Sequence, residues 1–186
     1  GTLVFAGYDA MAEGPAPGEG VGNLNSPWLR DYDPVRMGED IARQALQARE
    51  ARPMDRSIKA PVMVTAGELS GMLSSSIAFA LSAESVNKRR SPWGASLDKR
   101  VASPEIDLVD DPSDPQGALS AAYDDEGAPT TVKKIVENGV LRTFLYDSYN
   151  SSMSSRPPSG NGMRRGPSDA QYLFQSSPGC RPVNLT

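Results

Sequence analysis

The clearest periodic pattern along the chain lies between residues 66 and 84, where apolar side chains recur at three- and four-residue steps. The positions concerned are Leu69, Met72, Leu73, Ile77, Ala80 and Leu81. This spacing places them on one face of an α-helix. Thr65 and Glu68 precede the run at the spacing of a capping box, in which hydroxyl and carboxylate bind each other's free backbone amides. The sequence therefore predicts a helix over about 66–84.

Upstream of this helix the pattern is weaker. Asp33-Pro34 supplies an N-cap and a first-turn proline. A narrow apolar stripe follows at helical spacing, formed by Ile41, Ala42, Ala45 and Leu46. We expect a helix here that Pro53 ends. The apolar run 61–64 predicts a short buried strand before the 66–84 helix. Residues 7–32 hold glycines, prolines and small or acidic residues, which predicts loop, so the first domain segment, 1–32, is expected to be loop-rich and flexible.

The second half of the chain has the two-residue alternation of strands. Residues 106–109 alternate and run into a turn signal. Residues 130–136 and 140–146 are rich in β-forming side chains and flank Asn138-Gly139, the dipeptide typical of a tight hairpin. From Ser151 onward the chain has little periodicity. A strand–helix unit followed by an antiparallel, β-rich region with a hairpin predicts an α+β fold.

Charge and composition narrow the function classes. The 186 residues carry a formal net charge of −4, which argues against nucleic acid as the main partner, because phosphate binding needs a basic face. Two short basic runs, 88–90 and 164–165, are the candidates for such a face, and solvated loop charge explains them more simply. A stand-alone module that binds protein or nucleic acid, the latter through Arg89, Arg90, Arg164 and Arg165, is therefore the last of three alternatives.

The single cysteine, Cys180, excludes an internal disulfide. No apolar stretch is long enough for a membrane span and no signal peptide opens the chain, so we expect a cytoplasmic protein without a membrane partner. The first residue is Gly1 rather than methionine, which suggests a processed chain or a fragment.

The chain contains no histidine. Yet residues 67–72, Gly-Glu-Leu-Ser-Gly-Met, have the spacing of a metallopeptidase helix that carries His-Glu-x-x-x-His. Neutral imidazole is the commonest zinc ligand, and Gly67 and Met72 occupy the two ligand positions. Only Glu68 remains, and its simpler role is helix capping, while Met72 on the apolar stripe is expected to be a core residue. Serine and cysteine have no histidine to act as base, so we predict no catalytic residue, no metal ligand and no cofactor.

Six segments in order resemble the TldD/PmbA family, also called modulator-of-DNA-gyrase proteins. They are GELSGM…ALSAESV, VASPEIDLVDDP, YDDEGAPT, VENGVLRTFLYDSYNS, SGNGMRR and PVNL, spread over roughly residues 30–185. Complete family members are longer, so the region 33–186 is expected to be an incomplete family domain. No single segment is specific, but six in one order are.

This resemblance implies two kinds of subunit. One carries His-Glu-x-x-x-His and a cysteine from a C-terminal segment, binds a metal and cleaves peptides; the other lacks these ligands and pairs with the first. Here Gly67, Glu68 and Met72 stand at the motif positions, and Cys180 lies upstream of where the third ligand falls. The chain therefore resembles the kind without metal, a non-catalytic subunit in a homodimer or in a heterodimer with a metal-binding sister, and acting on peptides. An extended peptide is expected to add to an open strand edge such as the 130–146 hairpin.

Two polar clusters offer other sites. Asp110, Asp111, Asp124, Asp125 and Glu126 would suit an oxygen-ligand metal and a peptidase active by itself, although both segments have turn composition. The second cluster is Ser159, Gly160, Asn161 and Gly162, followed by Arg164 and Arg165. Its glycines allow a nest of backbone amides that would bind a peptide carboxylate or another anion, and a plain turn is the alternative.

Overall fold

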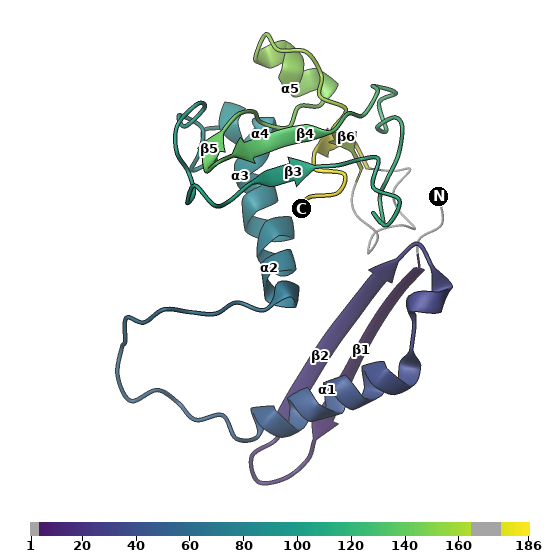
Figure 1. Cartoon of the computed structure of the whole chain (residues 1–186), viewed down its shortest axis with the longest axis vertical. Helices are drawn as coiled ribbons and strands as arrows, with labels where there is room; N and C mark the ends of the chain where they lie inside the picture. The colour runs from purple at the N-terminus through teal and green to yellow at the C-terminus, as the bar shows by residue number, and fades with distance from the viewer. Residues whose placement is uncertain (1–3, 165–175) are drawn as a thin grey trace. The chain divides into compact units, whose positions relative to one another are not determined.

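The computed structural model describes residues 4–164 and 176–186, which form two compact units that meet in the chain between Met63 and Val64 (Figure 1). The expected boundary after residue 32 therefore falls inside the first unit. Arg165, the last residue of the predicted anion site, lies outside the described residues.

The first unit is a hairpin covered by a helix. Strands β1 (Val4–Ala12) and β2 (Gly18–Ser26) pair antiparallel from Val4↔Ser26 to Ala12↔Gly18, and a short turn of helix, η1 (Leu29–Asp31), follows. Helix α1 (Pro34–Ala48) lies along the hairpin (Figure 1). The prediction of loop over 7–32 is thus wrong.

The glycines that suggested loop serve close packing instead. A Cβ at Gly18 would lie 2.2 Å from the Ala45 carbonyl oxygen, and one at Gly20 would lie 2.4 Å from that of Ile41. Glycine at alternate positions of β2 therefore lets the backbone of α1 approach the strand. Because β2 holds so few β-forming side chains, its composition resembles that of a loop.

Helix α1 begins as predicted, with the Asp33 carboxylate accepting hydrogen bonds from the Val35 and Arg36 amides at 3.1 Å each. The strand predicted over 61–64 is wrong. These residues belong to no strand and have no backbone partner within the described chain, and Val62 and Met63 are 82% and 97% exposed. An apolar run of four residues forms a strand only where a neighbour supplies the ladder bonds.

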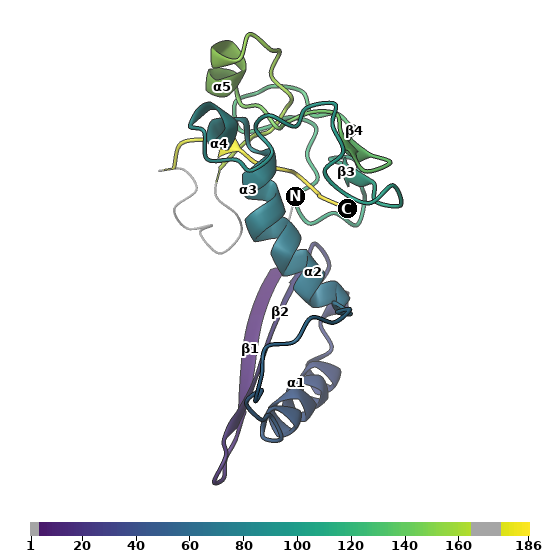
Figure 2. The ribbon, with the colours of Figure 1, turned by 90° about the vertical axis from the view of Figure 1, so that its left-hand side faces the viewer.

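The second unit opens with a helical rod (Figure 2). Helix α2 (Ala66–Met72) continues through η2 (Leu73–Ile77), which has π-helical hydrogen bonding, into α3 (Ala78–Leu81). The predicted helix is confirmed to Leu81 and then breaks. Ser82 is extended because the flanking backbone pairs with Leu145, whose N–H donates to Leu81 and whose carbonyl accepts from Ala83. A short helix, α4 (Ala83–Asn87), follows.

An antiparallel sheet packs against this rod in the order β3 (Leu108–Asp110), β4 (Lys133–Glu137) and β5 (Val140–Leu141). The predicted hairpin is confirmed: Asn138 and Gly139 have φ of 48° and 76°, the left-handed pair that a type I′ turn requires. Helix α5 (Ser148–Met153) and the two-residue strands β6 (Gly162–Met163) and β7 (Gly179–Cys180) complete the unit.

Strands, helices and the C-terminal segment share one core, and the α+β prediction is confirmed. The buried residues of this core are Leu81, Ala83, Leu108, Ile135, Val136, Leu141, Phe144, Leu145, Tyr146 and Cys180. Among the described residues, no helix combines the length and the apolarity that crossing a bilayer requires.

Candidate functional site

The segment that matches the metallopeptidase helix forms α2, and every residue of that helix is exposed. Apart from the backbone of the helix itself, no atom of the described residues lies within 4 Å of where a Cβ on Gly67 or Gly71 would stand. Glu68 is exposed at the first turn, and Met72 is 51% exposed. The expectation that Met72 is a core residue is therefore wrong in this chain, because the apolar stripe becomes buried only from α3 onward.

The capping interaction at the start of α2 is present in one direction. The Thr65 hydroxyl accepts a hydrogen bond from the Glu68 amide at 3.4 Å. Within residues 4–164 and 176–186, the structure has no return bond from the Thr65 amide to the Glu68 carboxylate. Glu68 therefore projects from an exposed helix end, and among the described residues no three His, Cys, Asp or Glu side chains gather in a way that would hold a metal ion.

Asp110, the first residue of the predicted acidic clusters, is the centre of a buried polar network. Its side chain is fully buried and accepts hydrogen bonds from the amides of Val183 and Asn184 at 2.8 and 2.9 Å. Its second oxygen binds the Asn161 amide group at 2.7 Å and the Lys133 ammonium at 3.4 Å. This carboxylate thus joins the end of β3 to β4, to the segment before β6 and to the C-terminal residues.

The other members of the acidic clusters bind backbone amides. Asp124 accepts from Glu126 and Ala128 with one oxygen and from Gly162, at 2.9 Å, with the other. Asp111 accepts from the amide and hydroxyl of Ser113, and these bonds lower the pKa of its carboxyl group. The turn interpretation of both clusters fits this geometry, and an oxygen-ligand metal site does not.

The glycine-rich segment 159–162 does bind carboxylates, but they belong to the chain itself. The Gly162 amide donates to Asp124, and the Arg164 amide donates to Asp125 at 2.7 Å. Asn161 is fully buried between Asp110 and the Arg181 carbonyl, to which it donates at 2.8 Å. These amides are therefore occupied, and recognition of an external peptide or anion by this segment stays a prediction.

Lys133 belongs to this network, and our sequence interpretation did not single it out. It precedes Lys134 in a strand, and two adjacent lysines read as solvent-facing charge. The available signal was the alternation of the strand: Lys133 shares a face with Ile135, which is fully buried.

The edges of the β3–β4–β5 sheet are already paired. On one edge, residues 98–102 pair with β5 and its turn. The amides of Asp98 and Val101 donate to the carbonyls of Leu141 and Gly139, and the Leu141 amide donates to the Lys99 carbonyl. On the opposite edge, Val109 and Thr186 exchange two hydrogen bonds. The prediction that the 130–146 hairpin offers an open edge to a peptide is therefore wrong.

Cys180 lies in β7 against the core and is 5% exposed. Burial raises the pKa of its thiol to about 11, and the neighbouring Asp147 carboxylate adds to the shift. At neutral pH the group is therefore a protonated thiol, which accepts a hydrogen bond from the Asp147 amide at 3.3 Å. Such a thiol is a poor nucleophile and a poor metal ligand.

A comparison with known protein families decides what this geometry belongs to. Residues 57–186 match the model of the PmbA/TldA metallopeptidase C-terminal domain. The chain belongs to this family. The match begins just before the second unit and includes α2, the Asp110 network and the segment 159–162.

Individual relatives agree with this assignment. The metalloprotease PmbA homolog of Buchnera aphidicola is 26% identical over 69% of the chain, and the metalloprotease TldD homolog of Haemophilus influenzae is 26% identical over 72%. A solved structure from Thermotoga maritima, named as a modulator of DNA gyrase, is 30% identical over 97% of the chain with a TM-score of 0.69. The chain spans 28% of the length of each of the first two proteins and 39% of the third.

Proposed function

We propose that the chain is a non-catalytic, PmbA-like subunit of a TldD/PmbA-type peptidase assembly that acts in peptide proteolysis. The supporting observation is α2, which presents Glu68 at the position of a catalytic glutamate but has Gly67 and Met72 where imidazoles would be needed. With no histidine in its sequence, the chain lacks the donor type on which a hydrolytic zinc site relies.

The proposed role has two parts, pairing and peptide binding. For pairing, the partner is a second copy or a sister subunit that carries the intact motif. For peptide binding, the β1–β2 hairpin supports the role, because within the described residues neither outer edge has a backbone partner. Free N–H and C=O groups along an extended edge are what a peptide needs to add as a strand.

Reconstitution tests this proposal. The chain is co-expressed with a family member that carries His-Glu-x-x-x-His, and co-purification, bound zinc and peptide cleavage are measured. We expect the two chains to co-purify, with one zinc per pair and with cleavage lost when the sister's motif glutamate becomes glutamine. The matched change in this chain, Glu68→Gln, is expected to leave cleavage unchanged.

The opposite result is equally clear. If the isolated chain holds one metal tightly and cleaves peptides, and if Glu68→Gln or Asp110→Asn abolishes that cleavage, the non-catalytic role is wrong.

A further inference from the structure

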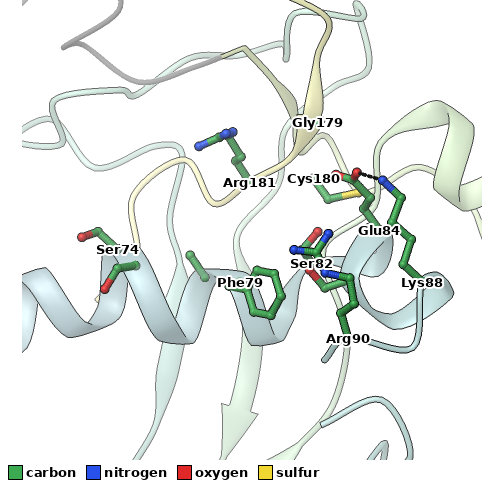
Figure 3. Close-up of a pocket in the computed structure, with 12 residues that line it drawn as sticks. Ser74, Phe79, Ser82, Glu84, Lys88, Arg90, Gly179, Cys180 and Arg181 are labelled. Atoms are coloured by element: carbon green, nitrogen blue, oxygen red, sulfur yellow. Dashed lines mark hydrogen bonds and ion pairs between the residues drawn. The ribbon is translucent and has the colours of Figure 1, made fainter. Parts of the chain in front are cut away.

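A cavity of about 310 Å³ opens in the second unit between the helical rod and β7 (Figure 3). It begins one turn beyond Met72, where η2 lies. The side chains around it are mostly small hydroxyls and cations. Its lining includes Ser74, Ser82, Ser85, Lys88, Arg90 and Arg181.

The electrostatics of this cavity favour an anion. Lys88 and Glu84 form an ion pair of 2.5 Å and offset each other's charge. Arg90 and Arg181 have no carboxylate partner among the described residues. Arg90 stacks on the Phe79 ring with 5.4 Å between guanidinium carbon and ring centre, which leaves the N–H groups in its plane available. The cavity therefore carries two uncompensated positive charges.

Two serines with little exposed surface add hydrogen-bond donors to the cavity. Ser82 and Ser85 are 7% and 6% exposed and line the cavity. Within the part of the chain that the structure describes, neither hydroxyl has a hydrogen-bond partner, and neither oxygen is among the side-chain atoms closed off from solvent. Both hydroxyls are therefore free to donate to a ligand with acceptor oxygens in the cavity.

The backbone holds both arginines in place before any ligand binds. After α4 the chain turns through Arg89 at φ 56°, and the Arg90 amide donates back to the Ser85 carbonyl at 2.7 Å, the closing bond of a Schellman motif. Asn161 fixes the backbone of Arg181 with two hydrogen bonds. The Asn161 carbonyl accepts from the Arg181 amide at 3.0 Å, and the Asn161 side chain donates to the Arg181 carbonyl at 2.8 Å. Anchored positions reduce the ordering cost of binding.

The remaining walls carry one carboxylate, Glu84, whose charge is offset by its ion pair with Lys88. The Cys180 thiol is neutral at physiological pH, for the reason given above. The π-helical turn η2 widens the helix where Ser74 lies, and such turns occur often at binding sites. From these observations we propose that the cavity is an oxyanion site that receives a carboxylate or phosphate group, and, on the basis of the proposed function, that the group is the terminal carboxylate of a bound peptide.

Calorimetric titration of the chain at low salt tests this proposal with three probes: a peptide with a free carboxylate, the same peptide as its C-terminal amide, and inorganic phosphate. We expect the free acid to bind, the amide to bind at least about tenfold more weakly, and phosphate to compete. Arg90→Gln and Arg181→Gln should each weaken binding about tenfold or more, because a hydrogen bond to a charged group contributes about 1.5–3 kcal/mol. Ser82→Ala should have a smaller effect.

Arg100→Gln is the matched control, since it removes one exposed positive charge away from the cavity and should change little. Phosphate binding that depends on both arginines, without peptide binding, supports the oxyanion site and rejects its peptide source. Equal binding of acid and amide, equal effects of all three arginine variants, or no binding of any probe overturns the site. None of these results depends on a sister subunit, so this proposal and the non-catalytic role fail separately.

Discussion

Two motifs of the second unit both contain glycines and both belong to the resemblance to the family, but they lie in opposite environments. They are residues 67–72 in α2 and residues 159–162, which lead into β6. The first is exposed throughout, and a Cβ on Gly67 or Gly71 would touch nothing. In the second, Asn161 is fully buried and a Cβ on Gly160 would lie 2.4 Å from the Pro129 carbonyl oxygen. A motif constrained by packing and a motif free of packing therefore look alike in the sequence, and the fold of this chain requires only the packed one, residues 159–162.

The strongest test of this contrast is Asp110→Ala at the centre of the buried network. We expect a loss of about 3–5 kcal/mol in the free energy of unfolding, because the Lys133 ammonium and two backbone amides would lose their buried acceptor. Urea unfolding measures the loss. Asp111→Ala, which removes exposed bonds within its own turn, should cost clearly less; equal losses would show that the buried network adds no more to stability than an exposed turn.

The next largest effect is expected for Gly160→Ala. Gly160 has a φ of 69°, which strains any other residue, and the added methyl group would press on the Pro129 carbonyl. Together these effects should lower the free energy of unfolding by about 2–3 kcal/mol. Gly127→Ala is the matched variant, because Gly127 has φ of 80° but open space around its Cβ position, and it should cost only about 1 kcal/mol. If both variants lose the same amount, backbone strain alone matters and the close contact does not.

Cys180, which pairs with Gly162 across β6 and β7, adds a pH dependence to the buried motif. Burial raises the pKa of its thiol from the ordinary 9.0 to about 11, so the folded state keeps the proton more tightly than the unfolded state. The associated stability is fully present below pH 9 and is lost as the pH rises to 11. Over this window the wild type should lose about 2 kcal/mol more than Cys180→Ala, measured by urea unfolding at both pH values; parallel losses would contradict the raised pKa.

The smallest effect is expected in α2. Gly71→Ala should stabilise this helix by up to about 1 kcal/mol, because alanine is the better helix former and no neighbour opposes its Cβ. Amide hydrogen exchange in α2 should slow about fivefold for 1 kcal/mol, while the midpoint of urea unfolding should change little. A destabilised helix would mean that α2 packs against something that the described residues do not include.

The sequence predicted those elements whose formation depends on neighbouring residues. Asp33 caps α1, Thr65 caps α2, and Asn138-Gly139 turns the hairpin, each through side-chain or backbone geometry within a few positions. The predictions from the sequence were wrong where residues far along the chain determine the local structure. Glycines in β2 suggested loop because the α1 backbone that explains them lies twenty or more residues away, and the 66–84 helix ends at Leu81 because Leu145 pairs with the backbone around Ser82.

For the candidate site, the amino-acid sequence by itself determined which donors are available: a glutamate in the position of a catalytic glutamate, no histidine, and one cysteine. The tertiary structure alone decided their states and neighbours. It buried Asp110 against Lys133, supplied internal carboxylates to the amides of the 159–164 segment, and brought Arg90 and Arg181 to one cavity. Residue identity fixes what a side chain can donate or accept, but burial and partners 20 to 90 residues apart fix whether it is free to do so.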